Sequence, residues 1–556
     1  MNCEEIIKKM NRDEKIALLT GKDSWHTVSL DRLGIPSIAV SDGPHGLRKI
    51  GTDANGKEFT YKATCFPTAS AMSATWNTEL VRKVGEAIGE ECGAMDVDVI
   101  LGPGTNIKRT PLCGRNFEYF SEDPYLAGEM SAAFIDGVQS RNVGTSLKHF
   151  AANNQEYDRF QINADIDIRT LREIYLKPFE IAVRKAKPWT VMCAYNRLNG
   201  IYCSENKFLL NDILREEWGF DGIVVSDWGA VHDRAKSLLA SLELEMPFSA
   251  KSADNLKKAL DAGVITENEI DNAVRKLLDF IFKAIESRKK RTKSYDTSEH
   301  HRLAKEAALE AITLLKNDEG ILPINSKKVR KIAVIGRLAQ EPAIQGEGSS
   351  HVEANLTDKP LDKILELAGN DIEVEYQPAY HTWDTGIGGL NKAMDAAMNS
   401  QMAVVFVGNR RGVEGEGFDR QSIRLSREME DVILRIAECN PNTVVVVQAG
   451  SAIDMSSWIG RVKAVVFTWF AGQAAGSAIA DILFGVSNPC GKIAETFPCS
   501  LEDTPAYGTY PGNGYVSRYA EGIMVGYRYY DTYKKDVLFP FGHGLSYTSF
   551  EYGDLK

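Results

Sequence analysis

Short apolar runs that end in polar residues recur through the first half of the chain. They read SIAVSD at 37–42, DVDVIL at 96–101, VGTSLKHF at 143–150, TVMCAYN at 190–196 and GIVVSD at 222–227. Helical stretches separate most of these runs, and strands that alternate with helices predict a parallel sheet. Five or more such units within about 290 residues favour a (β/α) barrel over an open sheet. We therefore predict an α/β protein in which residues 1–286 form a TIM-like barrel domain.

A second series of apolar runs fills the other half of the chain. It comprises KIAVIG at 331–336, IEVEY at 372–376, MAVVFVG at 402–408, TVVVVQAG at 443–450 and KAVVFTWF at 463–470. Continuous runs of Val and Ile indicate strands that are covered on both faces. This pattern predicts an α/β sandwich domain with a mainly parallel sheet over residues 302–545. A helix is expected at 427–437, with Ser426 as its N-cap.

A charged stretch with few apolar residues, SRKKRTKSYDTSEHH at 287–301, lies between the two series. It is predicted to be a solvated linker. The amphipathic run RLAKEAALEAITLLK at 302–316 then predicts the first helix of the second domain.

The charge balance narrows the class of partner. The 556 residues include 65 Lys and Arg against 76 Asp and Glu, a net charge of −11. An acidic chain disfavours nucleic acid and anionic membrane as partners, and the basic run at 287–301 lacks interleaved aromatic residues. The first twenty residues lack the apolar core of a signal peptide, and no uncharged apolar run reaches the length of about 18 residues that a membrane helix needs. A neutral small molecule fits as substrate, and the chain is compatible with a homo-oligomer.

Cysteine and histidine spacing gives no sign of a metal or cofactor. The nine cysteines form no CxxC pair, which favours free thiols in a reducing cytoplasm. The nine histidines show no HExxH spacing, and the glycine-rich loops match neither GxGxxG nor GxxxxGK[ST]. We therefore predict a cytoplasmic protein without metal or cofactor.

Polar residues at the ends of the first five runs converge on one mouth of a parallel barrel. They are Asp42, Lys148, His149, Tyr195 and Asp227. Singly each has an ordinary structural explanation, since Asp42 can cap a turn and His149 can be a core histidine. Their joint occurrence at strand ends favours a functional site.

Two segments of the chain contain carboxylates that are candidates for catalytic groups. Asp227 closes the strand GIVVSD, with Trp228 beside it as a surface on which a sugar could stack. In the second half, the loop GNRRGVEGEGFDR after 402–408 contains Glu414, Glu416 and Asp419 among glycines. Such a loop is expected to be mobile and exposed, and a merely solvated acidic loop is the alternative explanation.

Together the motifs resemble glycoside hydrolase family 3 over nearly the whole chain. They are SDGPHGLR at 41–48, GRNFEYFSEDP at 114–124, LKHFAANNQE at 147–156, VMCAYNRLNG at 191–200, DGIVVSDW at 221–228, GEGFDR at 415–420 and EGIMVGYRYYD at 521–531. The resemblance implies a barrel followed by an α/β sandwich and, in many members, a fibronectin-type-III-like domain. Residues 546–556 would then be the stub of that third domain.

The resemblance also assigns roles by motif. It implies that Asp227 is a nucleophile and that Glu416, from the second domain, is the acid/base. Asp42, Arg115, Lys148 and His149 would bind sugar hydroxyls, and Met192 and Tyr195 would form a wall. Arg48, Arg109 and Arg159 are expected to orient these groups. Glu414 is a competing acid/base candidate.

The implied activity is that of a retaining, exo-acting β-glycosidase, most specifically a β-glucosidase, whose substrates are β-glucosides. Retention requires an ionised Asp227 and a protonated Glu416. Nearby Arg and Lys are expected to favour the charge of Asp227, while enclosure is expected to raise the pKa of Glu416. Activity on xylosides, arabinofuranosides or N-acetylglucosaminides is the nearest alternative. KHFAANN at 148–154 argues against the last of these, and a sugar-binding protein without turnover is a further alternative.

Overall fold

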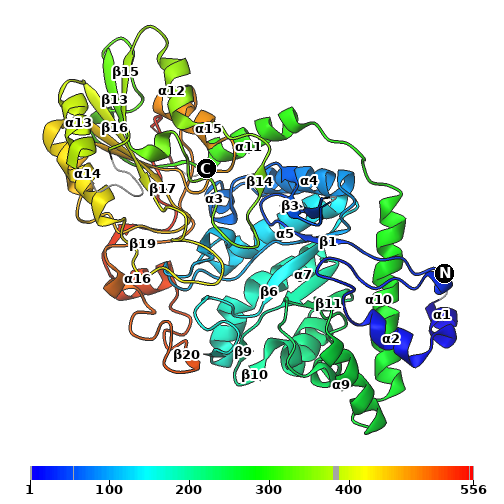
Figure 1. Cartoon of the computed structure of the whole chain (residues 1–556). Coiled ribbons are helices and arrows are strands. Elements are labelled where there is room, and N and C mark those ends of the chain that lie inside the picture. The colour runs from blue at the N-terminus through cyan, green and yellow to red at the C-terminus, as the bar shows by residue number, and fades with distance from the viewer. Residues whose placement is uncertain (1–2, 54, 380–386, 550, 552, 555–556) are drawn as a thin grey trace.

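The computed structural model describes residues 3–53, 55–379, 387–549, 551 and 553–554. Figure 1 shows two lobes side by side, one built from the first half of the chain and one from the second. Each lobe contains a largely parallel sheet with helices packed against it. The predicted α/β class is therefore correct for both halves.

A buried parallel sheet forms the centre of the first half. Among the described residues it has five strands in the order β1-β5-β6-β8-β11. They span Val40–Asp42, Val99–Leu101, Gly144–Phe150, Thr190–Cys193 and Ile223–Ser226, each inside one of the five predicted runs. Every residue in these strands is buried. Burial on both faces accounts for the near-continuous apolar character of the runs.

Capped amphipathic helices flank this sheet. They include α4 (Thr78–Ala94), α5 (Pro124–Ser140), α9 (Ala250–Asp261) and α10 (Glu267–Arg288). The Asn77 side chain accepts a hydrogen bond from the Leu80 amide at the start of α4, and Thr266 and Glu269 form a capping box at the start of α10. These caps satisfy backbone N–H groups that a helix leaves without internal partners.

A closed barrel is predicted for the first half, but the continuous strand pairing of its sheet ends at β11. Beyond β11, single bridges join Val225 to Leu244 and Glu245 to Thr20. The ladders of the described residues define a parallel sheet, but they do not define a closed barrel. The TIM-like barrel of residues 1–286 therefore stays a prediction.

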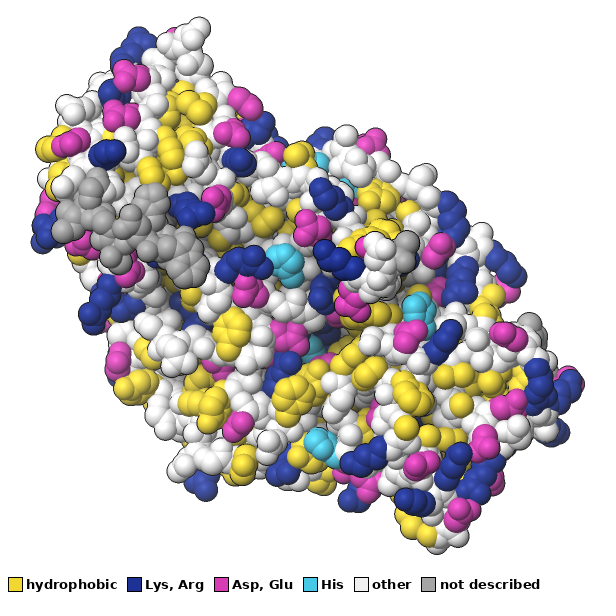
Figure 2. Space-filling model, in the orientation of Figure 1, with side chains coloured by type: hydrophobic (Ala, Val, Ile, Leu, Met, Phe, Trp, Pro, Cys, Tyr) yellow, Lys and Arg dark blue, Asp and Glu magenta, His cyan; other side chains and the backbone are white. Residues whose placement is uncertain are grey.

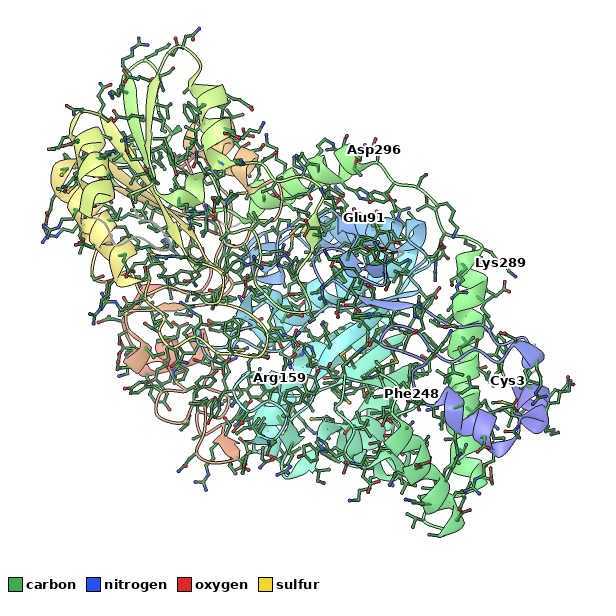
Figure 3. The ribbon with its side chains drawn as sticks, in the orientation of Figure 1. Cys3, Glu91, Arg159, Phe248, Lys289 and Asp296 are labelled. Carbon is green, nitrogen blue, oxygen red and sulfur yellow. The ribbon has the colours of Figure 1, made fainter. Side chains whose placement is uncertain are left out.

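The connection between the halves is shorter than expected. Helix α10 continues to Arg288, and α11 (Thr297–Ala311) begins after its N-cap, Asp296. Figure 3 labels Lys289 and Asp296 at the two ends of the connection. The predicted helix at 302–316 is wrong at its C-terminal end, because β12 (Thr313–Asn317) pairs there with β18. A short apolar run fits either a helix or a strand, so periodicity alone could not place this boundary.

Part of the charged connection is not solvated. Arg291 Nη1 lies 2.7 Å from Asp98 Oδ1, and Arg288 Nη2 lies 2.5 Å from Asp98 Oδ2. The Asp98 side chain is fully buried, so these arginines neutralise a charge that would otherwise be costly to bury. The prediction of a solvated linker is therefore wrong for Arg291, which is buried, whereas Arg288 stays partly exposed.

The second half is built on a larger sheet. In the described part of the chain it has six strands in the order β12-β18-β17-β16-β13-β15. The strands not yet given bounds are β13 (Lys331–Ile335), β15 (Glu373–Gln377), β16 (Met402–Gly408), β17 (Thr443–Gln448) and β18 (Ala464–Phe467). Only the β12–β18 pair of this sheet is antiparallel in the described residues.

Alternate residues of these strands pack on opposite faces. Val445 and Val447 lie in a cluster with α13 (Ile387–Met398) and α14 (Arg427–Cys439), whereas Val444 and Val446 lie in a cluster with α12 (Pro360–Ala368) and α15 (Ala475–Leu483). Helix α14 has Ser426 at its N-cap, as predicted. Helices on both faces explain why the Val runs are continuous.

Short strand pairs join the two halves. Strand β20 (Val516–Arg518) pairs in parallel with β7 (Asn163–Asp165), and β14 (Glu353–Ala354) pairs with β4 (Lys62–Ala63). These ladders fix the second half against the loops at the rim of the first. Strand β7 also pairs with β9 (Arg197–Leu198), which in turn pairs with β10 (Ile201–Tyr202).

No helix in the described ranges is long and apolar enough to cross a membrane. The predicted stub at 546–556 includes residues 550, 552, 555 and 556, which lie outside the described residues, and it stays a prediction.

Candidate active site

The polar residues predicted to converge at the strand ends do lie on neighbouring strands. Asp42 ends β1, Lys148 and His149 lie near the end of β6, and Tyr195 and Asp227 follow β8 and β11. All five side chains belong to buried residues. Figure 2 shows acidic, basic and histidine side chains gathered near the centre of one face, where the two lobes meet.

Asp227 is held by its own strand end. Its Oδ1 accepts a hydrogen bond of 2.8 Å from the Trp228 amide, and its Oδ2 lies 3.8 Å from His149 Nε2. Burial raises the pKa of Asp227, and the charge of Glu416 adds to this, while Arg115 and a hydrogen bond from Tyr195 oppose it. A fixed, buried carboxylate suits a nucleophile.

Aromatic side chains border this carboxylate. The Trp228 ring lies 5.9 Å from that of Trp25, and its Nε1 donates to Ser24 O at 2.9 Å. Tyr195 packs against Phe160, with ring centroids 4.6 Å apart. Met192 is buried within β8, in the same apolar cluster as Trp228. Met192 and Tyr195, predicted to form a wall, and Trp228, predicted as a stacking surface, thus lie at two adjacent strand ends.

Asp42 lies at the far end of the strand order and has its own counterion. Arg48 Nη1 is 3.1 Å from Asp42 Oδ2. Burial raises the pKa of Asp42 to about 6, although Lys148 and Arg48 both oppose this shift. Arg48 therefore orients a predicted substrate-binding carboxylate, as expected.

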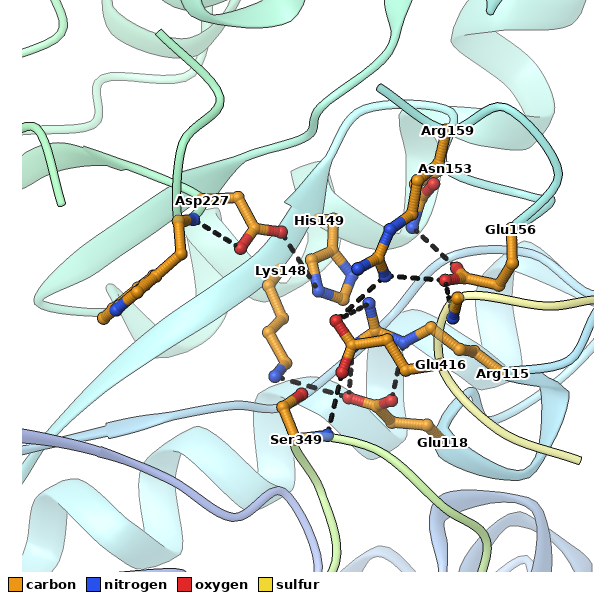
Figure 4. A network of polar contacts seen from close by, with 12 residues as sticks. Arg115, Glu118, Lys148, His149, Asn153, Glu156, Arg159, Asp227, Ser349 and Glu416 are labelled. Carbon is orange, nitrogen blue, oxygen red and sulfur yellow. Dashed lines mark hydrogen bonds and ion pairs between the residues drawn. The ribbon is translucent and has the colours of Figure 1, made fainter. Parts of the chain in front are cut away.

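A buried glutamate organises the basic residues of the site. Glu118 accepts hydrogen bonds of 2.8 and 2.9 Å from Arg115, and Lys148 Nζ lies 3.3 Å from the same carboxylate. Burial alone would raise the pKa of Glu118, but Arg115 and Lys148 outweigh it and the net pKa is lowered. The pair of cations is thereby held in place by an ionised group at its centre (Figure 4).

Glu416 reaches this cluster from the second half of the chain. Its Oε1 accepts a hydrogen bond of 2.9 Å from Arg159 Nη1 and lies 3.8 Å from Arg115 Nη1. Its Oε2 accepts a 2.8 Å hydrogen bond from the Ser349 amide. Figure 4 shows Asp227 and Glu416 on either side of His149 and Lys148. The two predicted carboxylates therefore belong to one polar network.

The pKa of Glu416 is shifted in the direction opposite to the one expected. Burial alone would raise the pKa of Glu416, but Arg115 and Arg159 outweigh burial, so that its pKa lies well below the usual range. The pKa of Asp227 is shifted upward instead. The basic residues were expected to favour the charge of Asp227, whereas Arg115 and Arg159 both form ion pairs with Glu416.

The loop that carries Glu414 and Glu416 is also less exposed than predicted. The Glu416 side chain is 17% exposed and that of Glu414 only 2%, although Arg411 on the same loop is 87% exposed. Glu414 accepts a 2.8 Å hydrogen bond from the Gly450 amide and lies 3.8 Å from Arg420. Its contacts are within the second half, which makes it a brace for the loop.

One predicted support lies elsewhere. Arg109 hydrogen-bonds to Glu521 Oε2 at 3.0 Å and to Arg518 O at 2.7 Å, and its guanidinium stacks on the Tyr519 ring. It ties a C-terminal segment to the first half and contacts none of the predicted sugar-binding groups in the described hydrogen bonds. Its assignment as an orienting residue of the site is therefore wrong.

Three residues of this network were not singled out from the sequence. Glu118 and Glu156 lie inside motifs already noted, GRNFEYFSEDP and LKHFAANNQE, but an acidic residue in a loop gives no sign that it is buried. Ser349 contributes a backbone amide, which carries no sequence signal. Elsewhere, the described residues contain no group of three or more His, Cys, Asp and Glu that could hold a metal ion.

Comparisons with known proteins agree with this arrangement. The Glycosyl hydrolase family 3 N terminal domain matches residues 6–280, and the Glycosyl hydrolase family 3 C-terminal domain matches residues 312–547. The chain therefore belongs to glycosyl hydrolase family 3 and is a glycoside hydrolase.

Relatives and solved structures extend the likeness over the whole chain. Thermostable beta-glucosidase B of Acetivibrio thermocellus is 50% identical, covering 100% of this chain and 74% of the relative. An exo-alpha-(1->6)-L-arabinopyranosidase of Bifidobacterium longum is 44% identical over 98% of this chain and 73% of its own length. The structure of beta-glucosidase 3B from Thermotoga neapolitana in complex with glucose has a TM-score of 0.92 and 36% identity, covering 100% of this chain and 84% of that one.

Proposed function

We propose that the protein is a retaining β-glucosidase that releases a terminal, non-reducing β-D-glucosyl residue, with Asp227 as nucleophile and Glu416 as acid/base. One observation carries the proposal: carboxylates from opposite halves of the chain face one buried polar cluster, with Asp227 Oδ2 3.8 Å from His149 Nε2 and Glu416 Oε1 3.8 Å from Arg115 Nη1. The naming of the Acetivibrio thermocellus relative supports the glucoside class.

The first step forms a glycosyl-enzyme. An oxygen of Asp227 attacks the anomeric carbon, and the bond from that carbon to the aglycone oxygen breaks as Glu416 donates its proton to this oxygen. The fixed position of the Asp227 carboxylate, which accepts a hydrogen bond from the Trp228 amide, supports its role as the attacking group. The products are the free aglycone alcohol and a glucosyl ester of Asp227.

The second step hydrolyses that ester. Glu416, now a carboxylate, accepts a proton from water, and the water oxygen attacks the anomeric carbon and displaces Asp227. The cations near Glu416 favour its charged form and so suit this step. Glucose is released with its original anomeric configuration, and Glu416 regains its proton.

The remaining predicted residues would bind the sugar. Asp42, Lys148, His149 and Arg115 would accept from or donate to its hydroxyls, and charged partners strengthen such bonds. Burial lowers the pKa of His149 well below its usual value, which keeps the imidazole neutral and able to accept a hydrogen bond. Met192, Tyr195 and Trp228 would contact the apolar face of the ring.

We further propose that the first sheet closes into a TIM-like barrel. The bridges from Val225 to Leu244 and from Glu245 to Thr20 are followed by bridges from Gly21 to Thr27 and from His26 to Ala39, directly before β1. This series supports a continuous path from β11 back to β1. A cytoplasmic location stays a prediction from the sequence.

A panel of nitrophenyl glycosides tests the function. We expect the largest kcat/KM on the β-D-glucoside, loss of turnover in Asp227→Ala, and β-glucosyl azide formation by Glu416→Ala when azide is added. The anomeric configuration of the first product, followed by NMR, tests retention. Absence of turnover on every glycoside, with binding of glucose intact, would instead support a sugar-binding protein.

An α-L-arabinopyranosidase is the second candidate, because the Bifidobacterium longum relative carries that name. This pentopyranoside lacks the exocyclic hydroxymethyl group of glucose and differs in one hydroxyl orientation. A missing group of this size changes pocket discrimination by only about 1–3 kcal/mol. Adding nitrophenyl α-L-arabinopyranoside and β-D-xyloside to the panel separates these substrate classes without altering the roles of Asp227 and Glu416.

A further inference from the structure

An acidic residue just beyond Glu416 binds the first half of the chain directly. Asp419 Oδ1 accepts hydrogen bonds of 3.0 Å from the amides of Gly114 and Glu156, and its Oδ2 accepts one of 2.9 Å from the Tyr157 amide. All three donors are backbone groups of first-half loops at the rim of the sheet. One second-half carboxylate therefore satisfies three amides across the junction.

Glu156 of the first half in turn binds the loop that carries Glu416. Its Oε2 accepts a hydrogen bond of 2.8 Å from the Gly417 amide and one of 2.6 Å from Arg159 Nη1. Arg159 Nη1 also donates to Glu416 Oε1. Glu156 therefore binds two neighbours of Glu416: Gly417, the next residue in the chain, and Arg159, which donates a hydrogen bond to the Glu416 carboxylate.

The surfaces fit with no spare room at this point. A Cβ on Gly114 would lie 1.8 Å from Phe418 O and 2.5 Å from Gly415 O, both on the loop that carries Glu416. A Cβ on Gly348 would lie 2.4 Å from the Cβ of Glu416 itself. Backbone atoms cannot move aside as a flexible side chain can, so the position of the loop is tightly set by its neighbours.

We propose that Asp419 is a positioning residue. Its carboxylate anchors the loop that carries Glu416 to the backbone amides of Gly114, Glu156 and Tyr157. This contact positions the acid/base, Glu416, relative to Asp227. The inference rests on the proposed role of Glu416. A misplacement of about 1 Å in a catalytic group can cost on the order of 100-fold in rate. Removing the hydrogen bonds of Asp419 should therefore impair proton donation by Glu416 while leaving the nucleophile, Asp227, in place.

The test separates proton donation from general damage. Phenyl β-glucoside needs a proton on its leaving group, whereas dinitrophenyl β-glucoside leaves without one. The ratio of the two kcat/KM values does not depend on how much of a variant is folded. In Asp419→Asn an amide group replaces a carboxylate oxygen facing N–H donors, and we expect kcat/KM on the phenyl glucoside to fall at least about tenfold more than on the dinitrophenyl glucoside.

A matched control is available in the same half. Asp454 is buried and, like Asp419, accepts a hydrogen bond from a backbone amide, that of Ser456 at 2.9 Å, but its hydrogen-bond partners lie in the second half. Asp454→Asn should leave the ratio of the two substrates at the wild-type value. A Cβ in Gly114→Ala would collide with backbone oxygens of the same loop, and this variant should bias the ratio in the same direction as Asp419→Asn.

Glu416→Ala, measured in parallel, keeps the two proposals distinguishable. If this variant shows the leaving-group bias but Asp419→Asn and Gly114→Ala reduce both substrates equally, the positioning role of Asp419 is wrong and the role of Glu416 stands. If Glu416→Ala itself shows no bias, the acid/base assignment fails, and the inference about Asp419 fails with it.

Discussion

The two halves of the chain present their carboxylates in different ways. Asp227 directly follows β11, and its nearest hydrogen bond comes from the next residue in the chain. Glu416 lies on a loop well beyond the end of β16, and its contacts include Arg159 and Arg115 of the other half. The first half thus positions its own carboxylate, whereas the carboxylate of the second half depends on its neighbour.

The electrostatic surroundings differ in the same sense. Burial, reinforced by Glu416, shifts the pKa of Asp227 upward, and two arginines shift that of Glu416 downward. The charged form of Glu416 is thus stabilised more than that of Asp227. In the proposed mechanism this suits the hydrolysis step, in which Glu416 acts as a carboxylate base. The first step additionally requires a proton on Glu416, and its cost should depend on how strongly the arginines hold the charge.

The largest effect is expected from the carboxylate that the first half positions alone. Asp227→Ala removes the attacking atom, and we expect kcat to fall by about 10⁴-fold or more, as for other catalytic nucleophiles. The loss should be of similar size on phenyl and dinitrophenyl glucosides, because the nucleophile acts on both. Steady-state kinetics with both substrates checks this, and a residual rate within tenfold of wild type would contradict it.

The carboxylate of the second half should have a smaller and substrate-dependent effect. Glu416→Ala should lower kcat/KM on phenyl glucoside by about 10²–10⁴-fold, the usual contribution of a general acid. On dinitrophenyl glucoside the first step should be nearly unchanged, and added azide should accelerate turnover. A uniform loss on both substrates without an azide effect would show that another group supplies the proton.

Arg159 tests the electrostatic side of the comparison. Its positive charge stabilises the Glu416 carboxylate, so Arg159→Met should raise the pKa of that group. A general acid must be protonated, and activity therefore falls above its pKa. The basic limb of the kcat/KM profile on phenyl glucoside should accordingly move to higher pH. Arg169→Met, at an exposed ion pair with Glu173, is the control that should leave the limb unmoved.

The smallest effect concerns the junction and not the chemistry. His300 of α11 contacts Glu91 of α4 at 2.8 Å and Glu90 at 3.3 Å. Burial alone would lower the pKa of His300, but these carboxylates outweigh it and the net pKa is raised. Its stabilising contribution is therefore full below the unfolded pKa of about 6.5 and is lost as the pH rises through the folded value.

For His300→Gln we expect a loss of about 1–3 kcal/mol in the free energy of unfolding below pH 6.5, shrinking at higher pH. Urea unfolding at a series of pH values measures this. His26→Gln, at a half-exposed contact with Asp23, should show little change at any pH. A loss for His300→Gln that grew with pH would contradict the predicted sign.

The same comparison explains what the sequence could predict. Asp42, Lys148, His149 and Asp227 stand at the ends of apolar runs, and the geometry of parallel strands brings such positions together. Glu416 was placed by its motif, but its surroundings were not. Whether a loop is exposed depends on tertiary contacts such as the amides that Asp419 binds, and a backbone amide carries no sequence signal.

Boundaries and charges were the least predictable features. The run at 302–316 fits one long helix, yet tertiary pairing with β18 turns its last residues into β12. The direction of the pKa shift of Glu416 was misjudged because the number of cations near each carboxylate cannot be counted along the sequence. The assignment of Arg109 failed for a related reason, since its partners Glu521 and Arg518 lie in the C-terminal segment.

The most direct test of the central claim is to trap the glycosyl-enzyme. The purified protein is incubated with a deoxyfluoroglucosyl fluoride, whose intermediate forms readily and hydrolyses slowly, and the labelled peptide is sequenced by mass spectrometry. We predict one fluoroglucosyl group per chain, attached to Asp227. A label on any other carboxylate would contradict the account, as would rapid inactivation of Asp227→Ala by the same reagent.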